Sequence, residues 1–338
     1  MIDVLKGIPR LDLGFTPTPL EPLDRLSELL GGPRIWIKRD DCTGLASGGN
    51  KTRKLEFLMG DAKANGADTV ITYGAVQSNH ARQTAAACAK LGIECHLVLS
   101  RRVTWRHPEY ETSGNVLLDR LLGAHLHFTE PANVEALSRK LIEDLTHKGR
   151  NCYVVPTGGS NAIGALGYVR CAGEIVDQSG GLGFQPDLIV HATSSGGTQV
   201  GLIAGLIAEN SKCAVLGINV YDTDPARIER RIARLLDETL DYVKLTPNAS
   251  ARPRIVHDFL GEDYGIPTRQ TIDAIQTLAA TEGIVTDPVY SGKALGGMFE
   301  MIRRGNLSSC DNVVFLHTGG TASLPVYTSA FQPDQRYE

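Results

Sequence analysis

Short apolar runs alternate along this chain with longer stretches in which apolar residues recur at helical spacing. The short runs predict strands, because strands buried on both faces of a sheet are apolar throughout. We expect strands at 35–39, 69–73, 96–99, 152–155, 188–192, 215–220 and 313–317. We expect helices at 23–30, 79–91, 113–122, 134–147, 161–176, 198–208, 225–236, 270–281 and 292–303. This order predicts an α/β fold with open, twisted, mostly parallel sheets covered by helices.

The chain has 338 residues, which is more than one ordinary hydrophobic core requires. The length therefore indicates about two domains. Because no long linker separates two halves, we expect the chain to cross between the domains more than once. The glycines at 180–183 predict a loop.

A glycine-rich loop precedes Lys51, and an amphipathic run follows it. Residues 47–55 read SGGNKTRKL, which predicts a loop that opens into a helix with Lys51 in its first turn. A cation is disfavoured at the positive end of a helix dipole. If Lys51 is also desolvated, its ammonium loses a proton more readily and becomes an amine nucleophile. The alternative is a solvated lysine on a helix surface.

Composition excludes several classes of partner. The hydrophobic share of 42%, the charged share of 21% and the net charge of -4 are those of a soluble globular protein without a basic surface for nucleic acid. We expect no membrane contact, because no apolar run is long enough to span a bilayer and the N-terminus lacks signal-peptide features. The seven cysteines show no C-x-x-C pair and predict reduced thiols in a cytoplasm. We expect no metal, since His80, His96, His125 and His127 show no ligand pattern alongside cysteines.

Three loops leave predicted strands and open helices or turns, which is where open α/β sheets bind ligands. Residues 74–80 (GAVQSNH) suit a carboxylate, although Ser78 or Asn79 could instead be a helix cap. Residues 192–199 (ATSSGGTQ) predict a phosphate cradle at a helix N-terminus, with a plain tight turn as the alternative. Residues 317–322 (HTGGTA) place a hydroxyl at the end of a strand.

The lysine loop also comes close to a nucleotide P-loop, but Asn50 separates Gly49 from Lys51. Without the required spacing, the lysine cannot reach phosphates held by the loop amides, so a nucleotide triphosphatase is disfavoured. A nucleophilic amine together with a separate phosphate cradle fits pyridoxal phosphate, which forms a Schiff base with lysine and carries a phosphate.

The sequence resembles a known family, the D-cysteine desulfhydrases and 1-aminocyclopropane-1-carboxylate deaminases. These are pyridoxal-phosphate enzymes of fold type II, the tryptophan synthase β-like class. The resemblance runs nearly end to end. Its motifs are 38–41 (KRDD), 47–55 (SGGNKTRKL), 77–80 (QSNH), 158–168 (GGSNAIGALGY), 286–290 (TDPVY) and 317–320 (HTGG).

The resemblance implies a role for each matching position. Lys51 would hold the cofactor, and Lys51, Ser78 and Tyr290 would form the catalytic set. The other cofactor contacts would come from Asn79, Ser195, Gly196, Gly197, Thr198, Tyr264 and Thr318. The amino-acid substrate would be bound by Gln77, Ser78, Asn79, His80, Gly159 and Ser160. It also implies a homodimer, with a small inserted α/β domain at 48–163 and a large cofactor-binding domain at 1–47 plus 164–338.

Two departures from the deaminase pattern indicate the reaction. Ser291 stands where the deaminases have a glutamate that contacts the pyridine nitrogen, and Thr318 stands where they have a leucine. A neutral hydroxyl does not enforce a protonated ring as a carboxylate does. The pair therefore predicts a carbon–sulfur lyase that releases hydrogen sulfide and ammonia from D-cysteine and leaves pyruvate.

Two alternatives to D-cysteine desulfhydrase activity stay open. The first is an L-cysteate sulfo-lyase, which releases sulfite. A sulfonate would need a cation in the pocket, and Arg101, Arg102 and Arg106 lie on a connection that could approach it. The second is a protein that binds the cofactor without catalysis, which the intact set of Lys51, Ser78 and Tyr290 argues against.

Overall fold

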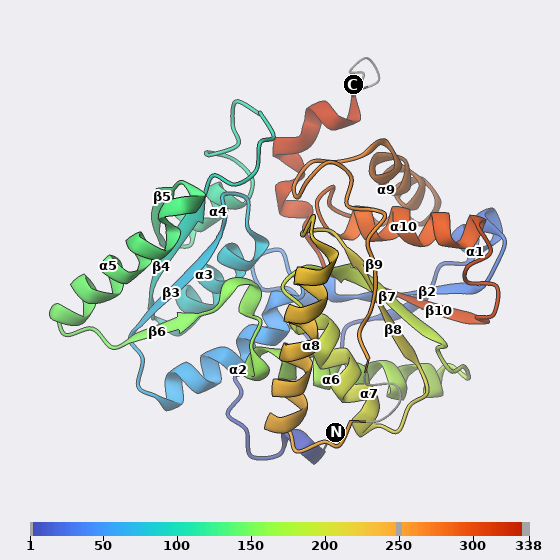
Figure 1. The fold of residues 1–338 in the computed structure, drawn as a ribbon, viewed down its shortest axis with the longest axis horizontal. Helices are drawn as coiled ribbons and strands as arrows, with labels where there is room; N and C mark the ends of the chain where they lie inside the picture. Colours follow the sequence, from blue (N-terminus) through green and yellow to red (C-terminus); the bar gives the residue numbers. More distant parts are fainter. Residues whose placement is uncertain (1–2, 248–251, 333–338) are drawn as a thin grey trace.

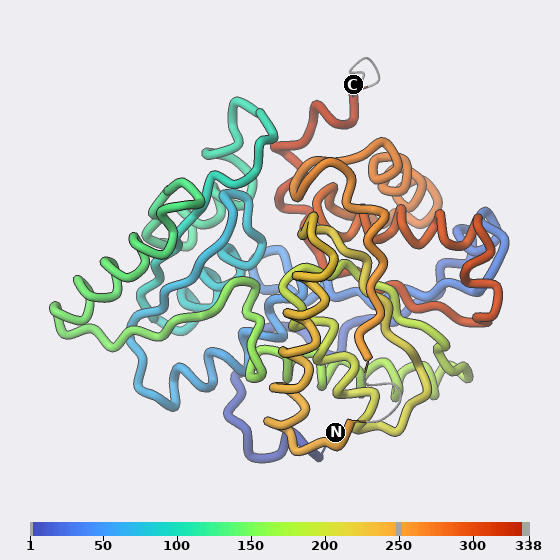
Figure 2. Tube along the Cα trace, in the orientation of Figure 1, coloured from blue at the N-terminus to red at the C-terminus, as the bar shows by residue number. Residues whose placement is uncertain are grey.

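The computed structural model describes residues 3–247 and 252–332 and contains two separate sheets, each covered by helices (Figures 1 and 2). The larger sheet has six strands in the order β1-β2-β10-β7-β8-β9. Its strands are β1 (Leu20–Pro22), β2 (Arg34–Arg39), β7 (Leu188–Thr193), β8 (Ala214–Asn219), β9 (Arg254–Val256) and β10 (Asn312–His317). Only β1 runs antiparallel to its neighbour.

The smaller sheet has four parallel strands in the order β5-β4-β3-β6. They are β3 (Thr69–Ala75), β4 (Glu94–Ser100), β5 (His125–Thr129) and β6 (Cys152–Val155). All of them come from the middle of the chain, whereas the six-stranded sheet takes strands from both ends. This arrangement accords with an inserted small domain. The boundary at 48–163 itself stays a prediction.

Ten α-helices lie in the described residues and pack on the faces of the two sheets. They are α1 (Asp24–Leu30), α2 (Lys51–Ala64), α3 (Asn79–Leu91), α4 (Asn115–Leu121), α5 (Val134–His147), α6 (Ala162–Gly181), α7 (Gly197–Ala208), α8 (Pro225–Tyr242), α9 (Arg269–Glu282) and α10 (Ser291–Arg303). Helices α6, α7 and α8 form the core on one face of the large sheet, and α1, α9 and α10 form the core on the other. Helices α2 and α3 cover one face of the small sheet.

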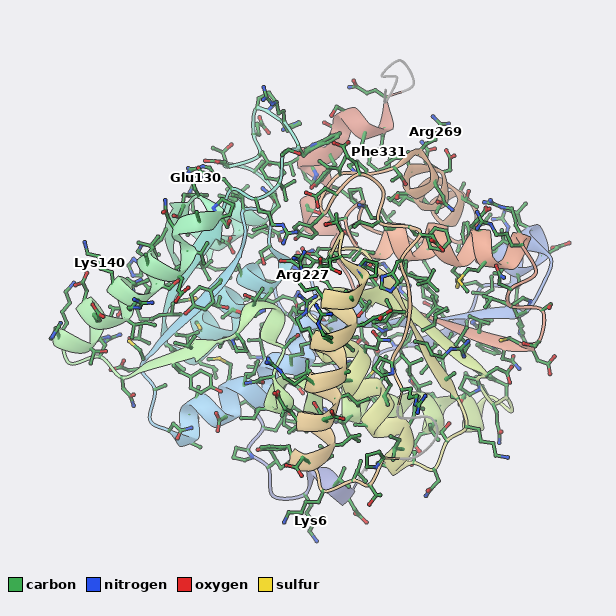
Figure 3. The ribbon with its side chains drawn as sticks, viewed as in Figure 1. Lys6, Glu130, Lys140, Arg227, Arg269 and Phe331 are labelled. Carbon is green, nitrogen blue, oxygen red and sulfur yellow. The ribbon has the colours of Figure 1, made fainter. Side chains whose placement is uncertain are left out.

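Short 3-10 helices complete the structure: η1 (Asp3–Leu5), η2 (Asp40–Thr43), η3 (Pro131–Asn133), η4 (Thr157–Gly159) and η5 (Thr321–Phe331). All seven cysteines are free, in accord with the reduced thiols expected from the sequence. Within the described parts of the chain, every helix is too short or too polar to cross a membrane. Charged side chains such as Lys6, Glu130, Lys140 and Arg269 point outward from the body of the protein (Figure 3).

The pattern of apolar residues predicted most elements, and the α/β class with mostly parallel sheets is confirmed. It missed β1, β5 and β9, which are short strands at sheet edges. The predicted end of a helix at 176 was wrong, because α6 continues to Gly181 through the glycines that predicted a loop. Beyond Val176, the Gln178 side chain donates a hydrogen bond to the Thr18 carbonyl at 2.9 Å. Such tertiary contacts outweigh the low helix propensity of glycine.

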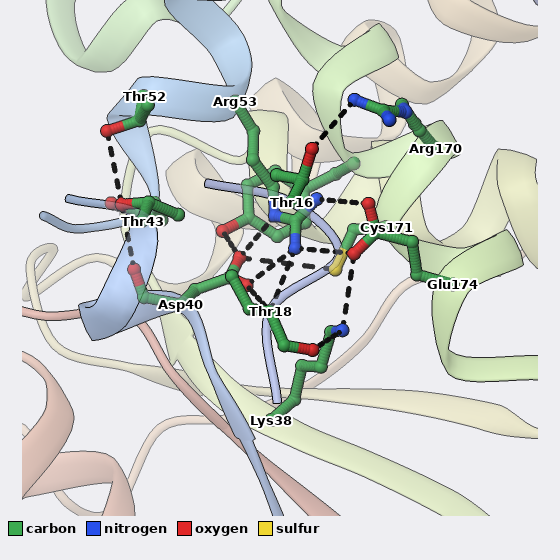
Figure 4. A network of polar contacts seen from close by, with 12 residues as sticks. Thr16, Thr18, Lys38, Asp40, Thr43, Thr52, Arg53, Arg170, Cys171 and Glu174 are labelled. Atoms are coloured by element: carbon green, nitrogen blue, oxygen red, sulfur yellow. Dashed lines mark hydrogen bonds and ion pairs between the residues drawn. The ribbon is translucent and has the colours of Figure 1, made fainter. Parts of the chain in front are cut away.

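A buried ionic network joins α2 to the rest of the protein (Figure 4). Arg53 of α2 is 1% exposed, and its guanidinium donates to Asp40 Oδ2 at 2.8 Å and to Glu174 Oε2 at 2.8 Å. Thr18 and Tyr168 also donate to Asp40, at 2.8 and 2.6 Å. Burial alone would raise the pKa of Asp40, but the Arg53 guanidinium outweighs burial and lowers that pKa. Asp40 therefore stays ionised, and the network is charged.

Replacement of Arg53 should destabilise the protein strongly. Arg53→Met leaves the fully buried carboxylate of Asp40 without its guanidinium and leaves Glu174 with Lys38 alone, which costs about 3–5 kcal/mol of unfolding free energy. Denaturant unfolding checks this value. The control is Arg139→Met, since Arg139 and Glu135 form an exposed pair on α5 that contributes less than about 1 kcal/mol. Equal losses in the two variants would contradict the prediction.

Candidate active site

A cavity of about 350 Å³ lies where the carboxyl ends of strands from both sheets meet. Its wall includes the loop after β3, the loop after β7 and the end of β10, as expected for parallel α/β sheets. Of the residues predicted from the sequence, it is lined by Lys51, Ser78, Asn79, His80, Ser195, Gly196, Thr198, Tyr264, Tyr290 and Thr318. The predicted residues outside the lining are Gln77, Gly159, Ser160 and Gly197.

Lys51 is the first residue of α2, as the sequence predicted, and its ammonium lies in the cavity wall. Its Nζ donates to Asn50 Oδ1 at 2.8 Å. Burial lowers the pKa of Lys51 to about 8, with Asp287 opposing this effect and Arg82 adding to it. A substantial fraction of the amine is therefore neutral near physiological pH, which a nucleophilic lysine requires.

A second buried lysine, Lys54, lies one turn along α2 and was missed by the sequence analysis. Its Nζ donates to the Gly158 carbonyl at 3.0 Å and to Ser160 Oγ at 3.1 Å. Burial, and secondarily the charge of Lys51, lowers its pKa well below the usual value. The spacing of three residues between the lysines places both on one side of the helix. That spacing was the available signal.

The loop after β7 has the form of an anion site. Gly196 is the N-cap of α7, with a φ of 91° and no side chain of its own to cap the helix. A Cβ on Gly196 would lie 2.9 Å from Ile232, and one on Gly197 would lie 2.6 Å from Ser160 Oγ and 3.1 Å from Lys54 Nζ. The N-terminal amides of α7, the positive end of the helix dipole and an adjacent amine together fit a phosphate group.

The loop after β3 combines capping with cavity contacts. Ser78 caps α3 by accepting from the Ala81 amide, which is the alternative that the sequence left open. Asn79 Oδ1 accepts a hydrogen bond from Asn115 Nδ2 at 3.0 Å. Gln77 turns away from the cavity and donates to the carbonyls of Tyr110 and Ser113. Gln77 therefore supports the loop in this structure, and its contact with a substrate stays a prediction.

His80 lines the cavity. Its Nε2 is 2.7 Å from Thr72 Oγ1, while its buried Nδ1 has no hydrogen-bond partner among the described residues. Burial lowers the pKa of His80 well below the usual value, and the nearby Lys51 and Lys54 act in the same direction. The imidazole is therefore neutral, and its free ring nitrogen is available to a bound polar group.

A pair of hydroxyls closes the wall at the end of β10. Thr318 lines the cavity, and its Oγ1 is 3.1 Å from Ser291 Oγ, which in turn donates to the Gly319 carbonyl at 3.0 Å. Asp287 lies close by, but its carboxylate accepts from the backbone amides of Val289, Tyr290 and Ser291. Ser291 and Asp287 lie behind the lining, so the side chain that meets the cavity at this point is the uncharged hydroxyl of Thr318.

Tyr264 and Tyr290 form a second wall, and their hydroxyls are in direct contact. Burial raises the pKa of both phenols. They are consequently protonated at neutral pH and can donate a hydrogen bond or a proton. Arg102 and Tyr221 also line this side of the cavity, and the sequence analysis assigned no site role to Tyr221.

The remaining predicted residues lie just behind the lining. Ser160 Oγ is 2.7 Å from Ser195 Oγ and accepts from the Gly197 amide, so Ser160 and Gly197 support the phosphate loop. Gly159 packs against Leu58, where an added Cβ would lie 3.1 Å from the leucine side chain. Away from the cavity, Glu94, His96 and His125 lie close enough together to hold a metal ion. The sequence analysis had interpreted these histidines as structural.

A buried lysine and a loop that fits a phosphate lie in one cavity, as a cofactor with an aldehyde and a phosphate would require. Comparison with known proteins supports this interpretation. Residues 11–319 match the family described as pyridoxal-phosphate dependent enzyme. The chain is 40% identical to the 1-aminocyclopropane-1-carboxylate deaminase of Burkholderia vietnamiensis, over 97% of this chain and 99% of the relative. It is 38% identical to that of Methylobacterium nodulans, with the same coverage.

Solved structures show the same relationship. A crystal structure of a 1-aminocyclopropane-1-carboxylate deaminase homologue superimposes with a TM-score of 0.88 and 37% identity over 97% of each chain. A fungal L-serine ammonia-lyase from Rhizomucor miehei, at 20% identity, shares the fold with a TM-score of 0.68 over 95% of this chain and 100% of the other. This chain therefore belongs to the fold-type-II pyridoxal-phosphate enzymes, in the family of 1-aminocyclopropane-1-carboxylate deaminases and D-cysteine desulfhydrases. Its cofactor is pyridoxal phosphate.

We predict that Lys51 carries the cofactor. Because its pKa is lowered to about 8, the amine is protonated below that pH and neutral above it. The rate at which the cofactor-free protein takes up pyridoxal phosphate should rise through about pH 8, as followed by absorbance. Borohydride should then fix the cofactor on the peptide that contains Lys51. Lys51→Ala should abolish this label, and Lys54→Ala should retain it. Recovery of the label on Lys54 would contradict the assignment of Lys51.

We also predict that the loop from Ser195 to Thr198 holds the phosphate. Gly196→Asp places a carboxylate against the anion site and forces a side chain onto a φ of 91°. Affinity for pyridoxal phosphate, measured by equilibrium dialysis, should fall by about two orders of magnitude. Gly181→Asp is the matched control, since Gly181 has open space around it. Unchanged cofactor affinity in a folded Gly196→Asp protein would show that the phosphate binds elsewhere.

Proposed function

We propose that this protein is a carbon–sulfur lyase that eliminates the β-substituent of an acyclic, sulfur-substituted alanine. The products are pyruvate, ammonia and the sulfur leaving group. The observation that carries the proposal is the neutral pair of hydroxyls at Ser291 and Thr318, which stands where the family resemblance places the pyridine nitrogen. Pyridoxal phosphate, when bound, supplies an electron sink for the two electrons that stay on Cα when its proton is removed.

The neutral wall favours elimination over ring opening. A carboxylate at this wall favours a protonated heterocycle, and a hydroxyl does not. The weaker electron demand is sufficient for removal of a Cα proton and departure of a good leaving group. Opening a cyclopropane ring is harder, so the reaction named for the deaminase relatives is the less favoured candidate for this chain.

The surrounding side chains are suited to general acid–base catalysis. The neutral amine of Lys51 can accept the Cα proton once the substrate amine has replaced it. The protonated phenol of Tyr290 and the hydroxyl of Ser78 line the same cavity and can deliver a proton or orient the substrate. Ser78, Asn79 and the free Nδ1 of His80 form the polar wall that we assign to the substrate carboxylate. This convergence favours catalysis over cofactor storage.

Two substrates satisfy this proposal. D-Cysteine carries a neutral thiol at its β-carbon at neutral pH, whereas L-cysteate carries a sulfonate. The sequence favoured D-cysteine. The choice depends on the charge of the cavity wall that faces the β-substituent.

The wild-type enzyme should form pyruvate from D-cysteine or L-cysteate and little 2-oxobutyrate from 1-aminocyclopropane-1-carboxylate. The double variant Ser291→Glu and Thr318→Leu introduces a carboxylate and removes the competing hydroxyl. It should lower the rate of sulfur release by about tenfold or more. The control Thr318→Ser keeps the hydroxyl and should stay near the wild-type rate. Chromatographic measurement of both oxo acids checks the prediction, and robust 2-oxobutyrate formation by the wild type would overturn it.

A further inference from the structure

The guanidinium of Arg102 lies in the wall of the active-site cavity and has no carboxylate partner in the part of the chain that the structure describes. Arg102 follows β4, is half-buried, and its guanidinium lies 4.1 Å from the centroid of the Tyr221 ring and 5.3 Å from that of Tyr264. Its hydrogen bond to the Tyr221 carbonyl is long, at 3.4 Å. Stacking on aromatic rings fixes the direction of the guanidinium and leaves its N–H donors available.

The neighbouring arginines are used differently. Arg101 donates to Glu111 at 2.7 Å, lies 3.7 Å from Glu130 and is exposed outside the cavity. Arg231, whose guanidinium lies 5.6 Å from the centroid of the Tyr221 ring, pairs with Asp222 at 3.7 Å and donates to the Ser194 carbonyl. Of these three arginines, only Arg102 lines the cavity.

The cavity lining has basic side chains and lacks acidic ones. Its lining includes Lys51, Lys54 and Arg102 and, among the described residues, no aspartate or glutamate. The phosphate cradle already has Lys54 beside it, and Lys51 is the residue that joins the cofactor. The substrate carboxylate is assigned to the loop after β3. Arg102 is the cation left without a negatively charged group.

We infer that Arg102 is the subsite for a second anion on the substrate, which makes L-cysteate, with its β-sulfonate, the preferred substrate. This inference rests on the proposed function and replaces the preference for D-cysteine drawn from the sequence. A sulfonate has three oxygens that accept charge-assisted hydrogen bonds from the planar guanidinium. A neutral thiol gains nothing from Arg102 and leaves its charge unpaired.

The reaction balances without an oxidant. The Cα–H bond breaks and its proton passes to the Lys51 amine. The Cβ–S bond then breaks and its electron pair leaves with sulfur as sulfite. The released enamine takes up water and yields pyruvate and ammonia. One L-cysteate and one water thus give one pyruvate, one hydrogen sulfite and one ammonium ion.

Steady-state kinetics of the holoenzyme test the inference with three substrates. They are L-cysteate, D-cysteine and β-chloro-L-alanine, which has the configuration of L-cysteate but a neutral β-substituent. Arg102→Gln should lower kcat/KM for L-cysteate by about 100-fold, mainly through KM. The value for β-chloro-L-alanine should change by less than about fivefold. Arg102→Lys should recover part of the loss, and the matched control Arg101→Gln should behave as the wild type.

Two kinetic outcomes would overturn the inference. Equal losses for L-cysteate and β-chloro-L-alanine in Arg102→Gln would show that Arg102 serves the α-carboxylate or the fold. Pyruvate from D-cysteine or β-chloro-L-alanine without sulfite from L-cysteate would also reject the sulfonate subsite, while the proposed lyase function would stand.

Calorimetry separates the subsite from the reaction. The probe 3-sulfopropanoate has the carboxylate and sulfonate of L-cysteate but no amine, so its binding does not require catalysis. It should bind wild-type holoenzyme more tightly than 3-mercaptopropanoate does, and Arg102→Gln should remove the difference. If no substrate yields pyruvate, the proposed function fails, and this measurement still decides the role of Arg102. Equal binding of the two probes to the wild type would overturn it.

Discussion

The buried ionic network around Arg53 is the constraint on which the active site depends. It joins the N-terminal segment at Thr18, the start of η2 at Asp40 and helix α6 at Glu174 to helix α2. Lys51 lies two residues before Arg53 on the same helix. A buried guanidinium needs partners for its donors, and Arg53 finds them in Asp40, Glu174 and Thr18 where α2 now lies. The network therefore fixes the position from which Lys51 enters the cavity.

Burial also determines the chemistry of the cavity. Removal from water lowers the pKa of Lys51 and Lys54 and raises that of Tyr264 and Tyr290. In each case the neutral form is favoured, because a low-dielectric environment disfavours charge. The result is a set of amines that lose their protons readily and of protonated phenols within one cavity. The elimination that we propose needs both a proton acceptor and a proton donor, and this environment supplies them.

The relatives share the scaffold of this chain. Nearly the whole chain aligns with deaminases at about 40% identity, and the fold is shared at much lower identity. A common scaffold leaves the choice of reaction to a few side chains in the site. For this chain we propose that the hydroxyls of Ser291 and Thr318 lower the electron demand of the cofactor and that Arg102 supplies a positive charge to the cavity.

The sequence by itself determined those helices and loops whose ends are set by residues within one turn of the chain. Helix α3 begins after Ser78 and ends at Gly92 as predicted, because an N-cap serine and a left-handed glycine act within one turn of chain. The glycine-rich loops and Lys51 were likewise visible as motifs, and they identified the cofactor. Short edge strands such as β5 carry weak signals, since pairing with a neighbour stabilises them more than their own residues do.

Only the tertiary structure decided which polar side chains reach the cavity. Gln77 belongs to the same motif as Ser78, yet it turns toward the carbonyls of Tyr110 and Ser113. Arg101 and Arg102 are adjacent in sequence, yet one pairs with Glu111 at the surface and the other stacks on Tyr221 inside. Residue type and local spacing cannot settle such choices. The direction of a long side chain depends on partners that are distant in sequence and meet it only when the two sheets are assembled.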